Sequence, residues 1–156
     1  MTDDDLLWPL IADGQQGVLA TLHADGRPHL SNVLYVVDKA SRMLRISTTA
    51  DRLKARNLAS DPRAALHVAS DNFWAYAVAD GSTTLSDVAA HPNDEAVTEL
   101  LAVHSAFYGP PDDTGEFSAE MIANHRLVVR LKVDRIYGLV AAGGRRPAPA
   151  TLAESD

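Results

Sequence analysis

The sequence contains no cysteine, which excludes a disulfide framework and a thiolate metal site and suits a reducing cytoplasm. It also contains no apolar run that approaches the roughly 20 residues needed to span a bilayer. The first residues, MTDDDLLWPL, are acidic where a secretory signal peptide is basic. We therefore expect a cytoplasmic protein with no membrane span.

Several catalytic motifs are absent as well. There is no GxGxxG after a strand, no Walker phosphate loop and no GxSxG elbow. The sequence therefore lacks the main signatures of dinucleotide-binding folds, P-loop enzymes and α/β-hydrolases. The six histidines never occur at a metal-ligand spacing such as HExxH, and we predict no metal site. A reaction carried by an organic cofactor would leave this pattern, because the protein then supplies binding and orientation.

The charge balance also excludes a class of partner. The chain has 21 acidic and 14 basic residues, and this balance disfavours a general nucleic-acid binder, which must neutralise many phosphates. A local basic patch remains compatible with a small anionic ligand. A length of 156 residues with 46% hydrophobic composition fits one domain, which we place at residues 1–142. Residues 143–156 are rich in Pro, Ala and Gly and predict a disordered tail.

Six segments have the alternation and turn signals of β-strands. Asp25 and Gly26 form an Asp-Gly hairpin signal between the first two. The six expected strands lie at 17–23, 28–38, 43–49, 63–70, 73–86 and 126–140. Antiparallel hairpins with helices inserted between them indicate a mainly β fold, a closed or split six-stranded antiparallel β-barrel with short helices.

Four segments predict helices. The first spans residues 3–13 and ends at Gly14, although Pro9 is expected to break or kink it. A basic helix follows at 51–60. Apolar residues recur at helical spacing from 96 to 108, including His104, Phe107 and Tyr108, after a cap at Asn93 or Asp94. A short helix is expected at 116–125.

The basic helix carries a cost that needs an explanation. Arg52, Lys54 and Arg56 stand in its first turns, where cations oppose the helix dipole, and the two arginines repel each other four residues apart. One explanation is that Asp51 caps the helix and that the cations are solvated. The other is that a bound anion, such as a phosphate, offsets the charge.

Four stretches together resemble one known family. They are GVLATLHADGRPHLSNVLY, ISTTADRLKARNLASDPRAALHV, WAYAVADG and HRLVVRLKVDRIYGL. Across residues 14–140 the chain resembles the flavin/deazaflavin oxidoreductase B branch of the pyridoxamine 5′-phosphate oxidase-like split β-barrel superfamily. The resemblance implies a homodimer that binds coenzyme F420, or in some members a flavin such as FMN, in a groove between the subunits.

The resemblance also implies which residues hold the cofactor. The segment DRLKARNL matches the phosphate-binding segment and places Arg52, Lys54 and Asn57 as contacts. The ring side of the groove is implied to contain Leu30, Ser31, Asn32, Ser47, Thr48 and Thr49. Trp74 and Tyr76 are implied to reach the cofactor site of the partner subunit, or otherwise to be core or dimer aromatics. Arg126, at the start of the last strand, is expected to be a second anion contact or a surface charge.

We therefore expect an F420-dependent reductase that transfers a hydride to a planar conjugated small molecule. Tyr76, Tyr35 or a water molecule in the groove could supply the proton, and Tyr76 is the catalytic candidate. Alternatives are a non-catalytic F420 or flavin carrier, an FMN-dependent oxidase of the superfamily, and a haem-handling split barrel. The C-terminal segment GGRRPAPATLAESD lacks the substrate signature of vitamin B6 oxidases, and its absence disfavours that activity.

Overall fold

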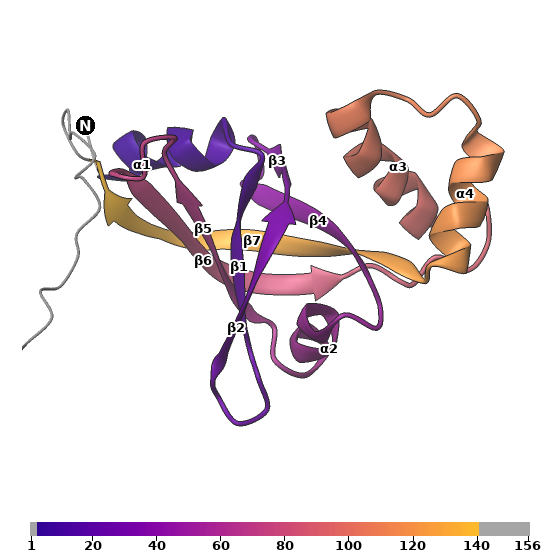
Figure 1. Cartoon of the computed structure of the whole chain (residues 1–156), viewed down its shortest axis with the longest axis horizontal. Coiled ribbons are helices and arrows are strands. Elements are labelled where there is room, and N and C mark those ends of the chain that lie inside the picture. Colours follow the sequence, from indigo (N-terminus) through magenta and orange to yellow (C-terminus); the bar gives the residue numbers. More distant parts are fainter. Residues whose placement is uncertain (1–2, 141–156) are drawn as a thin grey trace, which may run out of the picture.

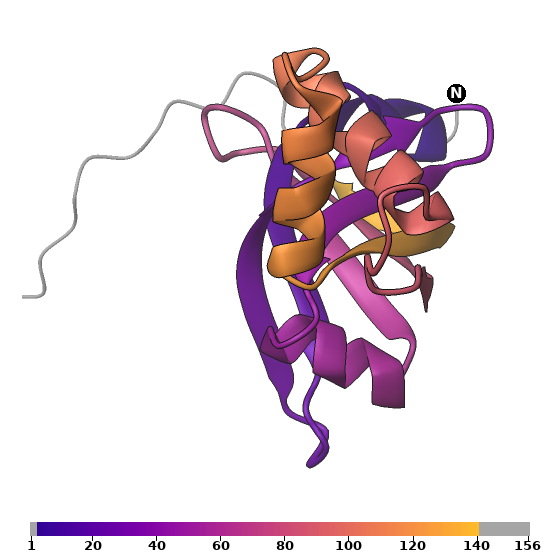
Figure 2. The same ribbon diagram turned by 90° about the vertical axis from the view of Figure 1, so that its right-hand side faces the viewer.

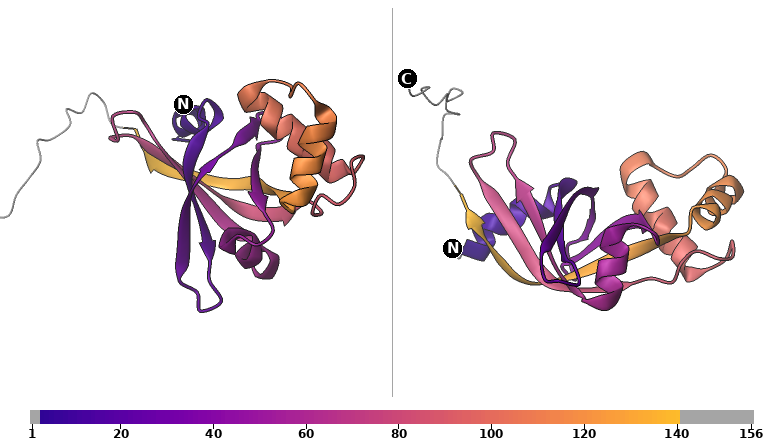
Figure 3. Two further views of the ribbon diagram at one scale, coloured as in Figure 1. Left: turned by 45° about the vertical axis from the view of Figure 1, so that its right-hand side comes forward. Right: turned by 60° about the horizontal axis from the view of Figure 1, so that its bottom comes forward.

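The structure, a computed structural model, describes residues 3–140, and the predicted tail at 143–156 lies outside them (Figure 1). Its helices are α1 (Asp3–Ala12), α2 (Leu53–Ser60), α3 (Glu95–Tyr108) and α4 (Thr114–Ala123). Its strands are β1 (Gln16–Leu22), β2 (Pro28–Leu34), β3 (Val36–Asp38), β4 (Met43–Thr49), β5 (Arg63–Ala69), β6 (Tyr76–Leu85) and β7 (Arg126–Leu139). All seven strands form one antiparallel sheet in the order β2-β1-β5-β6-β7-β4-β3. The sheet curves into a half-barrel, as the two views of Figure 3 show.

The mainly β, antiparallel prediction is confirmed, but the expected count of six strands is wrong. The segment predicted as one strand at 28–38 is two strands, β2 and β3, separated by the single residue Tyr35. β2 pairs with β1 at one edge of the sheet, and β3 pairs with β4 at the other edge. The chain therefore crosses from one edge to the other within one residue, which requires the sheet to curl until its edges meet.

Tyr35 is fixed at this crossing by its backbone and its side chain. Its amide nitrogen donates to the Gln15 carbonyl at 2.9 Å, and its hydroxyl donates to the Ile11 carbonyl at 2.7 Å. The side chain is 1% exposed, and burial, followed by the charge of Asp13, raises the pKa of the Tyr35 hydroxyl. Gly14 makes room for it, because a Cβ there would lie 2.3 Å from the hydroxyl oxygen. Tyr35 thus ties the split of the barrel to the end of α1.

Helix α1 continues through Pro9 instead of breaking there, contrary to the expected effect of proline. Leu7 and Ile11 flank the proline, and both are buried in the barrel core at 3% and 0% exposure. Their burial offsets the backbone hydrogen bond that Pro9 cannot donate. No helix within residues 3–140 has the length and apolar character needed to cross a membrane.

The sheet has an apolar core on each face along part of β7. Leu127, Val129 and Leu131 point into the half-barrel, where α1 and α2 also pack. Val128 faces the other way and is nevertheless 0% exposed, because it joins a second core formed with α3 and α4. The predicted alternation of β7 is confirmed, and its second face is covered locally by the helical pair.

The expected hairpin turn is confirmed. Gly26 has a φ of 86°, a left-handed conformation that glycine adopts readily, and the Arg27 amide donates to the Asp25 carboxylate at 3.1 Å. β1 and β2 consequently pair over their whole lengths. This register places Ser31 and Asn32 on the edge strand beside the split.

The hydroxyl of Tyr35 yields a stability prediction. Tyr35→Phe removes a buried hydrogen bond and leaves the Ile11 carbonyl only the Gly14 amide, at 3.2 Å, as a donor. We expect a loss of about 0.5–1.5 kcal/mol in the free energy of unfolding. Urea unfolding followed by circular dichroism measures it. Tyr137→Phe is the matched control, since Tyr137 is 46% exposed, and it should change stability by less than about 0.5 kcal/mol. Equal stabilities for the two variants would show that the Tyr35 hydroxyl does not hold the crossing.

Candidate functional site

A cavity of about 600 Å³ lies at the split of the barrel. Its sheet side comes from the unpaired edge of β2 and from β4, with the start of β7 and the first residues of α2 beside them. Its other wall comes from α3 and α4, which stand together in front of the sheet in Figure 2 with α2 below them. Because β2 and β4 are not hydrogen-bonded to each other, the barrel leaves this space between them.

The cavity brings together most of the residues predicted for cofactor binding. Those that line it come from four separate segments of the chain. They are Ser31, Asn32, Ser47, Thr48, Thr49, Arg52, Lys54 and Arg126. The structure therefore assembles residues nearly 100 positions apart around one space.

Four predicted residues lie elsewhere within their own chain. Leu30 is 63% exposed and does not line the cavity. Asn57 is 8% exposed and is not a lining residue, and its amide donates to the Thr21 hydroxyl at 3.1 Å, a contact that fixes α2 to β1. Trp74 and Tyr76 belong to the β5–β6 turn and the start of β6, at the end of the sheet away from α3 and α4 (Figure 1).

Helix α2 has no capping side chain. Its first flanking residue is Arg52, which makes no side-chain cap, and the helix begins at Leu53 instead of Asp51. The Asp51 carboxylate accepts a hydrogen bond from the Thr49 hydroxyl, so the explanation that Asp51 caps this helix is wrong. The positive end of the α2 dipole consequently meets the cavity without a counter-charge from a cap.

The two cations at this helix start are unpaired. Within residues 3–140, neither Arg52 nor Lys54 forms an ion pair. Burial, followed by the charge of Arg52, lowers the pKa of Lys54. A lysine in this state gains from an anion placed beside it, because the anion restores its preference for the charged form.

Arg126 approaches the same cavity from the sheet side. Its Nη1 donates to the Ser47 hydroxyl oxygen at 3.0 Å. Its Nε and the hydroxyl oxygen of Ser31 are buried, and neither has a hydrogen-bond partner in the described part of the chain. Buried polar atoms of this kind normally have partners, so a polar ligand in this cavity would satisfy them.

Besides the apolar core around Val128, one carboxylate joins the helical wall to the sheet. Arg45 on β4 and Arg130 on β7 stand directly opposite each other, an arrangement that repels. Glu99 of α3 accepts from the Arg45 Nε at 2.9 Å and from the Arg130 Nη2 at 2.6 Å. Burial opposes ionisation of Glu99, but the hydrogen bonds from Arg130 and Arg45 lower its pKa overall. The pairing places α3 over the sheet and therefore fixes the far side of the cavity.

The residues on that far side were not predicted as site residues. The sequence indicated a helix with His104, Phe107 and Tyr108 on its apolar stripe, and the structure places all three along the cavity. Phe117, Glu120 and Met121 of α4 complete the wall. The sequence pattern that could have identified this wall was a histidine and two aromatic residues on one apolar helix face. The same pattern also fits a helix that packs in an ordinary hydrophobic core.

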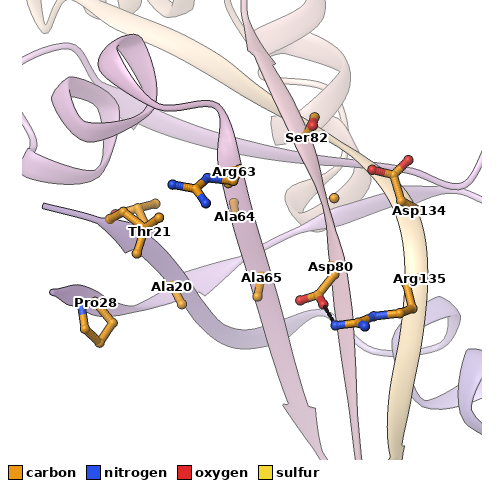
Figure 4. A pocket seen from close by; sticks show the side chains of 12 residues that line it. Ala20, Thr21, Pro28, Arg63, Ala64, Ala65, Asp80, Ser82, Asp134 and Arg135 are labelled. Carbon is orange, nitrogen blue, oxygen red and sulfur yellow. Dashed lines mark hydrogen bonds and ion pairs between the residues drawn. The ribbon is translucent and has the colours of Figure 1, made fainter. Parts of the chain in front are cut away.

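A second hollow of about 480 Å³ lies along β1, β5, β6 and β7 (Figure 4). Its floor includes Ala20 and Ala65, which pair with each other across β1 and β5. Its two arginines are already neutralised, because Arg63 pairs with Asp61 at 2.7 Å and Arg135 pairs with Asp80 at 2.6 Å. The cavity at the split is therefore the better anion site.

Metal chemistry receives no support from the described residues. Residues 3–140 contain no group of three or more His, Asp or Glu side chains that could hold an ion. The cavity at the split offers instead cations, hydroxyls and aromatic rings, a set of groups that suits an organic anion.

Solved structures with the same fold differ in what their names say. A conserved hypothetical protein from Mycobacterium tuberculosis is 23% identical, with 92% of this chain and 93% of that chain covered and a TM-score of 0.68. An F420 reductase is 23% identical, with 84% and 95% covered and a TM-score of 0.62. The heme storage protein HutZ from Vibrio cholerae is 16% identical, with 88% and 94% covered and a TM-score of 0.63. At these identities the comparisons establish the fold alone.

The family of the chain is identified from its sequence. Residues 7–139, which include every strand of the half-barrel, match the profile of pyridoxamine 5′-phosphate oxidase. The chain belongs to the pyridoxamine 5′-phosphate oxidase family.

Proposed function

We propose that the protein is an F420-dependent reductase that transfers a hydride to a planar conjugated small molecule. The observation that carries the proposal is the pair of unpaired cations, Arg52 and Lys54, at an uncapped helix start inside a cavity. Such a helix start, with free backbone amides and a positive dipole end, favours a phosphate. The resemblance to the flavin/deazaflavin oxidoreductase B branch gives the same position to the cofactor phosphate.

Different cavity residues would contact different parts of the cofactor. Arg52 and Lys54 would neutralise the phosphate, with backbone amides of the first turn of α2 as further donors. Ser31 and Arg126 would donate to other polar groups of the cofactor from the atoms that now lack partners. When bound, the reduced deazaflavin ring supplies the hydride, and the protein orients the ring.

Two features favour the deazaflavin over a flavin. F420 carries an anionic tail beyond its phosphate, and the cavity adds a third cation, Arg126, to the two that a single phosphate would need. A structure with this fold is named an F420 reductase. FMN is the alternative cofactor, since it presents a phosphate to the same cations.

The helical wall supports a flat, mainly apolar acceptor. Phe107, Tyr108 and Phe117 supply aromatic surface, and Leu100 and Met121 supply aliphatic surface. Stacking in a mostly preformed cleft brings reacting atoms close together, which accounts for a large part of catalysis when the cofactor carries the electrons. Enones and quinone-like compounds fit this description.

We propose further that the protein acts as a homodimer. Leu30, Leu34 and Phe73 are 63%, 46% and 75% exposed, and Phe73 has a strained φ of 74°. A second copy would cover this surface and bring Trp74 and Tyr76 of one subunit to the cavity of the other. In this arrangement Tyr76 remains a candidate proton donor, although within its own chain its ring stacks on His67 away from the cavity.

The dimer proposal predicts that the protein sediments with the mass of two chains throughout the micromolar concentration range. Analytical ultracentrifugation of the protein with and without FMN or F420 measures it. A folded monomer that binds cofactor at these concentrations would exclude the shared site.

The phosphate assignment predicts different effects for two neighbouring cations. Lys54→Ala should weaken cofactor binding by about 1.5–3 kcal/mol, the worth of a charge-assisted hydrogen bond. It should not reduce stability in the absence of ligand, because it removes a partly buried cation next to Arg52. Arg56→Ala is the matched control on the same helix, since Arg56 is exposed and does not line the cavity.

Titration calorimetry with F420 and with FMN measures both variants. Equal losses for the two substitutions, or none for Lys54→Ala, would place the phosphate elsewhere. The ratio of the two cofactor affinities in the unsubstituted protein identifies the preferred cofactor.

The reductase activity predicts that the protein accelerates oxidation of reduced F420 by enones or quinones. Anaerobic mixing, followed by the return of oxidised-deazaflavin absorbance, measures the rate against a mixture without protein. Tyr76→Phe should lower turnover modestly if its hydroxyl supplies the proton. Tight cofactor binding without acceleration for any acceptor would favour a carrier, a role that the fold also serves in a heme storage protein.

A further inference from the structure

Two polar side chains on the helical wall of the cavity, His104 and Glu120, form no hydrogen bond or ion pair with the described part of the chain. The His104 ring packs against Tyr108 and Phe117, with ring centroids 5.1 Å and 5.0 Å apart, and none of its described contacts is a hydrogen bond. Glu120 is an exposed residue of α4, on the helix that also carries the buried side chains of Phe117 and Met121, and all three line the cavity. In the described part of the chain, its carboxylate forms neither a hydrogen bond nor an ion pair.

Charge is distributed unevenly around the cavity. Arg52, Lys54 and Arg126 approach from α2 and the sheet, whereas Glu120 belongs to the opposite wall. Of the described residues that line this space, Glu120 alone is acidic. A ligand with a positive or proton-donating end would be repelled by the sheet side and attracted to the helical side.

The aromatic residues that line the same wall as Glu120 define the shape of that ligand. Tyr108, Phe117 and the His104 ring form a tilted cluster that offers both ring faces and ring edges. Flat aromatic groups pack well against such clusters. A carboxylate beside them can only accept hydrogen bonds when it is ionised, so its ligand partner must be a donor.

We propose that the α3–α4 wall is the acceptor subsite and that Glu120 determines its specificity. Among flat conjugated compounds, including enones and quinone-like compounds, it selects those that carry a cationic or hydrogen-bond-donating nitrogen at the end that faces α4. The assignment of this ligand as the hydride acceptor rests on the proposed function. The binding preference itself does not, because it requires only the cavity and its charges.

Two matched pairs test the preference. On the ligand side, p-aminobenzamidine carries a cationic amidine, and p-aminobenzamide is its neutral counterpart. On the protein side, Glu120→Gln removes the charge at nearly constant size. Glu116→Gln removes an acidic charge one turn earlier on the same helix, at a residue that does not line the cavity.

Fluorescence titration of the protein without added cofactor measures each dissociation constant. Glu120→Gln should weaken p-aminobenzamidine binding about threefold to tenfold, the range for a charge-assisted contact with a solvent-exposed carboxylate. Its effect on p-aminobenzamide should stay below about twofold. Glu116→Gln should change neither ligand by more than about twofold.

Three results would overturn the proposal. They are equal effects of the two glutamate substitutions on the amidine, equal effects of Glu120→Gln on the two ligands, and no binding of either ligand to the unsubstituted protein. Cofactor affinity of the Lys54→Ala variant is measured separately, so failure of the acceptor subsite leaves the phosphate assignment intact. Failure of the phosphate assignment would likewise leave the amidine titration valid.

Discussion

The crossing at Tyr35 is the constraint on which the rest of this structure depends. The two edge strands, β2 and β3, are consecutive in the chain but lie at opposite ends of the strand order. One residue can join them only if the sheet curls until its two edges lie side by side. The buried hydroxyl of Tyr35 ties this crossing to the carbonyl of Ile11 at the end of α1. The cavity exists because the curl leaves β2 and β4 adjacent but without hydrogen bonds between them.

Several arginines of the framework form ion pairs within the chain, whereas the cations that line the cavity at the split do not form them with the described residues. Glu99 joins two arginines that would otherwise repel each other, and the resulting cluster fixes α3 over the sheet. Arg63 and Arg135 are likewise neutralised by neighbouring aspartates. Among residues 3–140, the cations at the split have no such acidic partners, which favours a bound anion beside them. The lowered pKa of Lys54 fits this preference.

The related structures show how little the fold restricts chemistry. Proteins named as an F420 reductase and as a heme storage protein share this architecture with the chain at 23% and 16% identity. The strands supply the common frame, and the cavity side chains decide the ligand. In this chain the helical wall, with His104, Glu120 and aromatic residues, is the surface that we propose as the acceptor subsite.

Much of the local structure could be predicted from the sequence, since it depends on neighbouring residues. The Asp25-Gly26 turn, the alternation in β4 and β7 and the position of the cationic helix follow from backbone preferences and side-chain periodicity. The segment around Arg52 and Lys54 was also singled out, through resemblance and through its unfavourable charges, and its role in cofactor binding stays a prediction.

Other features depended on contacts between distant segments. The run at 28–38 reads as one strand, and only the closure of the sheet divides it at Tyr35. Asn57 resembled a cofactor contact, but packing of α2 against β1 directs its amide to Thr21. Helix α3 had the apolar stripe of a core helix, and the position of Glu99 over two strands decided that this stripe also lines a cavity. Apart from the division at Tyr35, sequence alone determined the strand segments, the Asp25-Gly26 turn and the basic helix, because those depend on neighbours in the chain. The tertiary structure decided which of their side chains share the cavity, because that depends on residues up to 95 positions apart, from Ser31 to Arg126.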